Sequence, residues 1–217
     1  FYFNRLGKPT KKKIITRHDS YHGSTYLTMS MTGVVFDHIG FDLVADGLIH
    51  RISSPNTYRR PEGMTEAEFL DQLIAEFRAK IEELGPENVA AFFAEPIQGA
   101  GGVIVAPKGY HPAMAGICQE YGVLYVADEV VTAFGRLGHF FASEDVFGMV
   151  PDIITAAKGM SSAYAPLSAN IISDEIYEVL SVPQARGAMF THGFTYSGHP
   201  VCCAAGLKNI EIMERED

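Results

Sequence analysis

Residues 123 to 129 read Val-Leu-Tyr-Val-Ala-Asp-Glu, and residues 152 to 159 read Asp-Ile-Ile-Thr-Ala-Ala-Lys-Gly. Each stretch is a short apolar run that ends at a charged side chain, Asp128 in the first and Lys158 in the second. Continuous runs of this kind are typical of strands that are covered on both faces of a sheet. The two stretches therefore predict buried strands with polar groups at their carboxyl ends.

The neighbouring segments complete an α/β pattern. Val89 to Ala94 predicts another apolar strand, Tyr110 to Tyr121 a helix that Gly122 ends, and Val123 to Ala127 the next strand. A strand–helix–strand order implies a right-handed parallel crossover. We expect one α/β fold with a mostly parallel central sheet and helices on both faces. Three more strands are predicted at residues 13–16, 153–157 and 169–172, and a closing helix at residues 200–215.

Residues 65 to 84 form the clearest predicted helix. Thr65 and Glu68 make a capping box at its start, apolar residues recur at helical spacing, and Gly85 followed by Pro86 ends it. Residues 34 to 64, in contrast, are rich in Gly, Pro, Asp and Ser and predict a long irregular segment, of the kind that often borders a functional site.

Composition excludes several classes of protein. The 217 residues are 47% hydrophobic, enough for one sizeable core, and the net charge of −9 disfavours binding to nucleic acid or to a membrane surface. No run approaches the roughly 20 apolar residues of a membrane span. The three cysteines lack the spacing of a disulfide framework or a metal site, and His18 and His22 lack further ligands nearby, so we expect no metal and a reducing, cytoplasmic setting.

Three charged residues, Glu95, Asp128 and Lys158, each follow a predicted strand, where ligands bind in open α/β sheets. Desolvation at a strand end would favour the uncharged amine of Lys158, which is a nucleophile toward aldehydes. A lysine for the imine and an aspartate for the ring nitrogen suit a pyridoxal-phosphate site. Taken singly, each residue could equally be a solvated loop residue or a helix cap, so the interpretation depends on the ordered set.

Six motifs, in order, resemble those of the class III aminotransferases of pyridoxal-phosphate fold type I, and the resemblance spans essentially the whole chain. Within that family, the runs from Glu95 to Val105 and from Phe190 to His199 resemble the ω-amino acid or amine–pyruvate transaminases. Val131 stands where ornithine- and GABA-type relatives usually have glutamine. The six motifs are Tyr21-His22-Gly23, Glu95-Pro96-Ile97-Gln98-Gly99, Asp128-Glu129-Val130, Phe134-Gly135-Arg136, Lys158-Gly159 and Thr195-Tyr196-Ser197-Gly198-His199-Pro200.

The resemblance implies two catalytic residues. Lys158 would form the Schiff base with pyridoxal 5'-phosphate and would then move a proton between the substrate carbon and the cofactor, a step worth roughly 10²–10⁴-fold. Asp128 would keep the pyridine nitrogen protonated, so that the ring can accept electrons. Glu95 would lie near Asp128 or the substrate amine, where two close carboxylates would raise one pKa.

The resemblance also implies residues that bind the cofactor and a second subunit. Tyr21 would stack on one face of the ring, with His22 and Gly23 beside it, and Val130 would pack on the other face. Thr195, with Phe194 beside it, would reach the cofactor phosphate of the neighbouring subunit, which implies a homodimer with shared active sites.

By the same resemblance, residues 1–217 are a partial cofactor-binding large domain, without the upstream phosphate-binding turn and the downstream small domain. We therefore expect this piece to bind the cofactor weakly and to turn over slowly or not at all. The implied function is transfer of an amino group from an amine or ω-amino acid to pyruvate. An aminomutase or diamino-pelargonate-type synthase of the same family, or a non-catalytic subunit or scaffold, are the alternatives, and the donor and enantioselectivity stay open.

Overall fold

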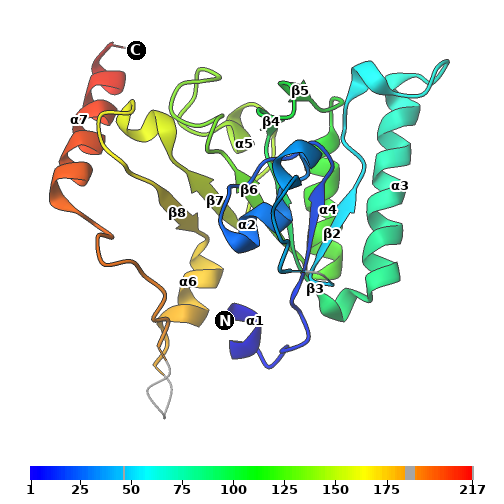
Figure 1. Ribbon diagram of the computed structural model, residues 1–217, viewed down its shortest axis with the longest axis horizontal. Helices are drawn as coiled ribbons and strands as arrows, with labels where there is room; N and C mark the ends of the chain where they lie inside the picture. Colours follow the sequence, from blue (N-terminus) through cyan, green and yellow to red (C-terminus); the bar gives the residue numbers. More distant parts are fainter. Residues whose placement is uncertain (46, 184–188, 217) are drawn as a thin grey trace.

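A six-stranded sheet forms the centre of the computed structural model, which describes residues 1–45, 47–183 and 189–216 (Figure 1). The strand order is β2-β1-β3-β6-β7-β8; the first five strands are parallel and β8 runs antiparallel to β7. The predicted mostly parallel α/β sheet is therefore confirmed. The strands are β1 (Lys13–Arg17), β2 (Ile49–Ile52), β3 (Val89–Ala94), β6 (Leu124–Asp128), β7 (Ile153–Ala156) and β8 (Ala169–Ile172).

Two long helices, α3 (Glu66–Leu84) and α4 (Tyr110–Tyr121), lie next to each other along the sheet (Figure 1). The predicted capping box is confirmed: the Glu68 amide donates to Thr65 Oγ1 at 3.2 Å, and Glu68 Oε2 accepts from the Thr65 amide at 2.8 Å. The apolar stripe of α3 is buried against the sheet, where the Phe77 and Phe92 rings lie 4.6 Å apart. Burial of each such side chain contributes about 1.5–3 kcal/mol.

Shorter elements surround this core. Helix α7 packs on the 3-10 turn η4 (Lys158–Ser161), and α1 packs on α6. The predicted closing helix is present as α7, and a short helix, α2, lies at Tyr26–Met31. The remaining elements are α1 (Tyr2–Arg5), α2 (Tyr26–Met31), α5 (Ala142–Asp145), α6 (Asp174–Ser181), α7 (Pro200–Glu216), η1 (Val35–His38), η2 (Thr57–Arg59), η3 (Pro86–Asn88), β4 (Ile97–Gln98) and β5 (Ile104–Val105).

The prediction of an irregular segment over residues 34–64 is wrong at Ile49–Ile52. These four residues form the edge strand β2, which pairs in parallel with β1. An edge strand is hydrogen-bonded on one side only and tolerates polar side chains, so its alternation of Ile, His, Arg and Ile lacks the apolar run of a central strand. Helix α6 and the β4–β5 ribbon were not predicted either.

The parallel strands bring distant residues to one edge of the sheet. Strands β1, β3, β6 and β7 all point the same way, so their carboxyl ends lie together. Glu95 directly follows β3, Asp128 is the last residue of β6, and Lys158 follows β7 by two residues. The fold therefore gathers at this edge the three charged residues that the sequence singled out.

Candidate active site

A cavity of about 150 Å³ opens at the carboxyl edge of the sheet. Every predicted site residue except Thr195 lines it. Ala100 and Val131 line it as well. Val131 is the position at which GABA-type relatives usually have glutamine, whereas Ala100 was not singled out, because a small apolar side chain carries no chemical signal. The lining residues are Tyr21, His22, Gly23, Glu95, Ala100, Asp128, Val130, Val131 and Lys158.

The Asp128 carboxylate is held by two hydrogen bonds. Its Oδ2 lies 2.8 Å from His22 Nδ1, and its Oδ1 accepts from the Val130 amide at 3.2 Å. Because an ionised carboxylate can only accept, Nδ1 of His22 is the donor. Asp128 is only 7% exposed, and the His22 ring is packed edge-on to Phe93 at 4.9 Å. The carboxylate is therefore fixed in one orientation in the wall of the cavity.

Lys158 lines the same cavity from the start of η4. Its backbone lies in the left-handed region, with φ of 38°, a conformation that costs a non-glycine residue about 1–3 kcal/mol and is frequent at functional sites. Its Nζ has no hydrogen bond or ion pair within the described residues. The desolvation expected from the sequence is wrong for this chain, because the residue is exposed: η4 turns it away from the buried end of β7.

The following turn is fixed around Lys158 by close packing. A Cβ on Gly159 would lie 3.0 Å from the Cβ of Phe134, closer than most Cβ atoms approach a neighbour, so a larger residue here would have to displace Phe134. Asn209, on α7, donates its amide to the Gly159 carbonyl at 2.8 Å. Helix α7 thus supports the turn that carries the lysine.

Gly23 is required by the backbone as well as by space. Its φ is 123°, and a Cβ would lie 2.8 Å from Thr28 Oγ1. The Thr32 hydroxyl donates to the Gly23 carbonyl at 3.1 Å and accepts from the His22 amide at 3.0 Å. The Tyr21-His22-Gly23 turn is therefore tied to the end of α2.

Glu95 is 4% exposed, and its carboxylate contacts main-chain amides. Oε1 accepts from the Tyr21 amide at 2.9 Å and Oε2 from the Gly99 amide at 3.0 Å. Burial raises the pKa of Glu95, while the hydrogen bond from Tyr21 and then the positive charge of Arg17 oppose that rise. The expected cause, a second carboxylate, is not among them, and no hydrogen bond joins Glu95 to Asp128.

Glu129, next to Asp128, has a different task. It is fully buried, and its oxygens accept from the amides of Ala142 at 2.7 Å and Ser143 at 2.8 Å and from the Thr132 hydroxyl at 3.1 Å. These contacts satisfy free amides at the start of α5. Glu129 therefore holds the loop between β6 and α5, which includes Val130 and Val131.

Residues of two of the six motifs lie outside the cavity. Thr195 is exposed and does not line it, and Phe194 beside it is 77% exposed. Arg136, in the Phe134-Gly135-Arg136 motif, is exposed and has no ion pair within the part of the chain that the structure describes.

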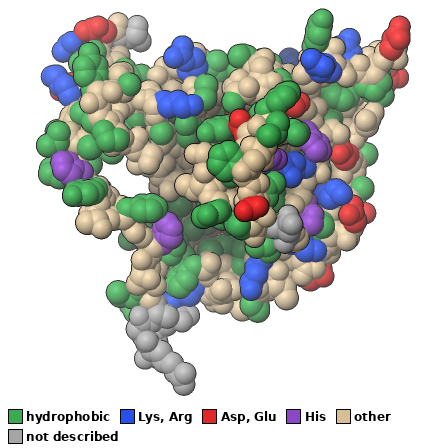
Figure 2. Space-filling view, in the orientation of Figure 1, with side chains coloured by type: hydrophobic (Ala, Val, Ile, Leu, Met, Phe, Trp, Pro, Cys, Tyr) green, Lys and Arg blue, Asp and Glu red, His purple; other side chains and the backbone are tan. Residues whose placement is uncertain are grey.

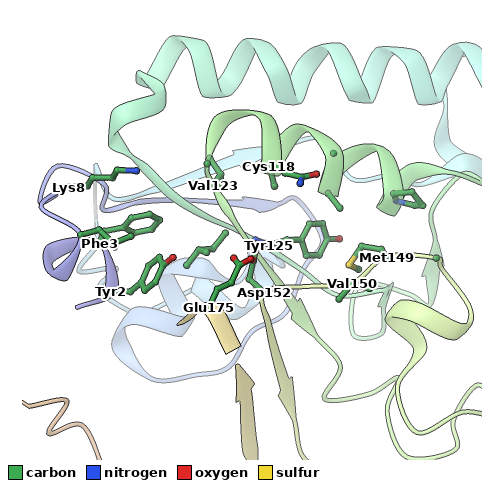
Figure 3. Close-up of a pocket in the computed structure, with 18 residues that line it drawn as sticks. Tyr2, Phe3, Lys8, Cys118, Val123, Tyr125, Met149, Val150, Asp152 and Glu175 are labelled. Carbon is green, nitrogen blue, oxygen red and sulfur yellow. Dashed lines mark hydrogen bonds between the residues drawn. The ribbon is translucent and has the colours of Figure 1, made fainter. Parts of the chain in front are cut away.

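A larger cavity, of about 600 Å³, lies at the opposite edge of the sheet (Figure 3). Tyr2, Asp152 and Glu175 are among its lining residues, together with Tyr125 at the start of β6. Asp152 accepts from the Tyr125 amide at 2.6 Å, and burial raises the pKa of Asp152. In open α/β sheets ligands bind at the carboxyl ends of strands, and this cavity adjoins the amino ends of β6 and β7, so we assign the chemistry to the smaller one.

Comparison with known proteins agrees with this geometry. The family model described as Aminotransferase class-III matches residues 1–217. The chain belongs to the class III aminotransferases. These are pyridoxal-phosphate-dependent enzymes of fold type I, so the family resemblance, the fold and the enzyme class expected from the sequence are confirmed.

Individual class III aminotransferases are similar over the whole chain. An uncharacterised aminotransferase, y4uB, of Sinorhizobium fredii is 45% identical; the match covers the whole of this chain and 46% of the relative. Gamma-aminobutyrate transaminase 1 of rice, named as mitochondrial, is 44% identical; the match covers the whole of this chain and 42% of the relative. The solved (S)-enantioselective omega-transaminase of Thermomicrobium roseum is 44% identical, with a TM-score of 0.94 over 99% of this chain and 47% of that one. The omega-transaminase of Pseudomonas jessenii, solved in complex with PMP, is 43% identical with a TM-score of 0.93, over 99% and 47%. The chain thus spans about half the length of the aminotransferases it matches.

Two further observations concern membrane-spanning helices and metal sites. Over residues 1–45, 47–183 and 189–216, no helix combines the length and hydropathy that a membrane crossing requires. Over the same residues, no three His, Cys, Asp or Glu side chains are grouped so that they could hold a metal ion.

Proposed function

We propose that this protein is a transaminase that moves an amino group from an amine or ω-amino acid to pyruvate. Residues 1–217 act in it as the cofactor-binding part of the large domain. The single observation that supports the proposal most is the cavity in which an unpartnered lysine amine and a fixed carboxylate occur together, Lys158 and Asp128.

The residues of the cavity fit pyridoxal phosphate. Lys158 offers an amine that no other described group engages, and Asp128 offers an anion for a protonated ring nitrogen. Tyr21 and Val130 supply an aromatic and an aliphatic surface for the ring. When bound, the cofactor supplies an aldehyde and a ring that accepts electrons.

The chain's own residues then have separate tasks. Lys158 Nζ carries the proton that leaves the substrate carbon, and its position at the mouth of the cavity leaves room for an amine to enter. Asp128 stabilises the positive charge on the ring nitrogen, and His22 keeps that carboxylate in place. Proton transfer by a positioned group contributes roughly 10²–10⁴-fold to the rate.

The proposal that pyruvate is the amino acceptor depends on the similarity of this chain to the omega-transaminases. Val131 lines the cavity where GABA-type relatives usually have glutamine, and the chain has solved omega-transaminases among its neighbours. Transaminases named for gamma-aminobutyrate are equally similar in sequence, so the acceptor must be tested directly. An aminomutase would need no external keto acid, which separates that alternative in the same assay.

A homodimer with shared active sites is part of the proposal. Figure 2 shows apolar side chains spread over the face that carries α2. Large apolar residues are exposed there, such as Tyr26, Phe36 and Ile39, and again at Phe194 and Tyr196. Apolar side chains that are exposed in this number favour an interaction site. A second copy of the chain would cover it, and Thr195 would then reach the partner's site.

We also propose a reducing compartment such as the cytoplasm. Cys118, Cys202 and Cys203 are all free thiols, as is usual where disulfides do not form.

The decisive experiment traps the cofactor on the protein. We expect borohydride treatment of the full-length protein with pyridoxal phosphate to label Lys158, as located by peptide mass mapping, and Lys158→Ala to abolish the label and the transfer from amines to pyruvate. Lys12→Ala, at an exposed lysine outside the cavity, is the control and should keep both. Labelling that survives in Lys158→Ala would overturn the assignment of Lys158, and failure to trap the cofactor at Lys158 would favour a scaffold.

A further inference from the structure

Glu95 joins two walls of the cavity that are distant in sequence. One wall is the Tyr21-His22-Gly23 turn after β1, and the other is the segment from Gly99 to Ala100 after β3. The Glu95 carboxylate accepts one hydrogen bond from each wall, from the Tyr21 amide and from the Gly99 amide, at 2.9 and 3.0 Å. One buried side chain therefore sets the separation of the two walls.

Neighbouring contacts hold the same two segments together. Gln98 is fully buried and donates to the His18 carbonyl at 2.8 Å. A Cβ on Gly101 would lie 2.1 Å from the Asp19 carbonyl oxygen, so the two backbones touch there. Residues 95–101 thus contact residues 18–21 at three positions, through Glu95, Gln98 and Gly101. Of these three residues, Glu95 is the one that lines the cavity.

The chemistry of Glu95 suits this task better than contact with substrate. Both carboxylate oxygens already accept from main-chain N–H groups, which every residue type except proline supplies. Beneath it, Arg17 is buried and donates to the Glu95 carbonyl at 2.5 Å. The side chain and the main chain of Glu95 are therefore both fixed, as is typical of a group that holds other residues in place.

We propose, resting on the function proposed above, that Glu95 is a positioning residue whose carboxylate clamps the Tyr21 turn against the Gly99 turn. The clamp gives the Tyr21 ring one position over the cavity, so that the pyridine ring of the cofactor meets a preformed surface. Glu95 does not bind the substrate amine in this arrangement.

Two substitutions test the clamp. Glu95→Gln keeps the length but turns an NH₂ donor toward one of the two amides, and Glu95→Asp keeps the charge but is one methylene too short to reach both. Glu76→Gln is the matched control, since Glu76 is a partly buried carboxylate that accepts from the Ser53 amide at 3.0 Å, outside the cavity. Far-UV circular dichroism checks that each variant is folded.

The first readout needs no cofactor. We expect hydrogen exchange to accelerate roughly tenfold or more at one or both of the Tyr21 and Gly99 amides in each Glu95 variant, because each variant loses at least one hydrogen bond to a charged acceptor. The same amides should be unchanged in Glu76→Gln. Unchanged exchange at both amides in the Glu95 variants would overturn the clamp.

The second readout is titration with pyridoxal phosphate, followed by absorbance and by the visible circular dichroism of the bound ring. Both Glu95 variants should bind it roughly tenfold or more weakly and lose the induced dichroism, with little change in the KM for the amino donor. A raised donor KM at unchanged cofactor affinity would overturn the clamp and return Glu95 to substrate binding. If the wild-type protein binds no pyridoxal phosphate while exchange still accelerates, the clamp stands and the proposed function fails.

Discussion

Replacing His22 by phenylalanine tests how the site holds its carboxylate. The His22 ring is buried, and its Nδ1–H is one of two donors to Asp128, at 2.8 Å; the other is the Val130 amide at the longer distance of 3.2 Å. Its Nε2 is buried without a partner among the described residues. Phenylalanine keeps the shape of the ring and its packing on Phe93, and it removes only the donor.

The expected loss follows from that single contact. A hydrogen bond to a charged group contributes about 1.5–3 kcal/mol, so Asp128 without it must be ordered by the ligand itself. We expect His22→Phe to bind pyridoxal phosphate roughly 10- to 150-fold more weakly. His22→Asn, which retains a short N–H donor, should recover part of the loss.

The assay is an absorbance titration with pyridoxal phosphate on the folded protein. His50→Phe is the matched control, because His50 also has a buried Nε2 without a partner but lies on β2, outside the cavity. If His22→Phe binds the cofactor within twofold of the wild type, His22 does not hold Asp128 and the reasoning is refuted.

Three further predictions concern charge, pH and backbone. Asp128→Asn keeps the shape but loses the charge, so we expect turnover to fall by 10²-fold or more, on the order of a positioned catalytic group; kcat near that of the wild type would exclude a role for the charge. Burial lowers the pKa of His111 to about 3, against about 6.5 when unfolded. Below pH 6.5, His111 therefore binds a proton in the unfolded chain but stays neutral in the folded chain. The free energy of unfolding should then fall by about 1.4 kcal/mol per pH unit between pH 6 and 4. Urea unfolding measures this free energy at each pH. Its decrease per pH unit should be larger for the wild type than for His111→Phe by about that amount, and equal pH dependence in the two proteins would contradict the prediction. Gly23→Ala should lower stability by about 1–3 kcal/mol, because its Cβ would meet Thr28; Gly63→Ala, which also has a positive φ but open space, should lower stability less in the same unfolding experiment.

The central part of the fold could be predicted because its signals are local. The helix Glu66–Leu84 has a capping box and a continuous apolar stripe, and β3 and β6 are apolar runs bounded by turns. Strand β2 has no such signal, since it owes its existence to pairing with β1, which lies over thirty positions earlier. The antiparallel direction of β8 likewise depends on how the chain returns after Lys158.

The candidate site also has features that could be predicted from the sequence and features that could not. That Lys158 and Asp128 lie in one cavity could be predicted, because parallel strands must end at one edge of the sheet; their catalytic roles stay a prediction. The partners of Glu95 could not, since its carboxylate meets main-chain amides, and an amide has no residue type by which a sequence could point to it. The exposure of Lys158 was also missed, because it follows from a left-handed turn that a lysine adopts rarely.

Asp128 and Glu129 illustrate how strictly the sheet must be aligned. They are adjacent, yet one carboxylate faces the cavity and the other supports α5. Since side chains alternate along a strand, a slip of one position between β6 and β7, away from the pairing of Asp128 with Thr155, would exchange their surroundings. The protein would keep two acids at the same place and lose its reactive centre, so mutations that loosen this pairing could silence the enzyme without touching a single active-site residue.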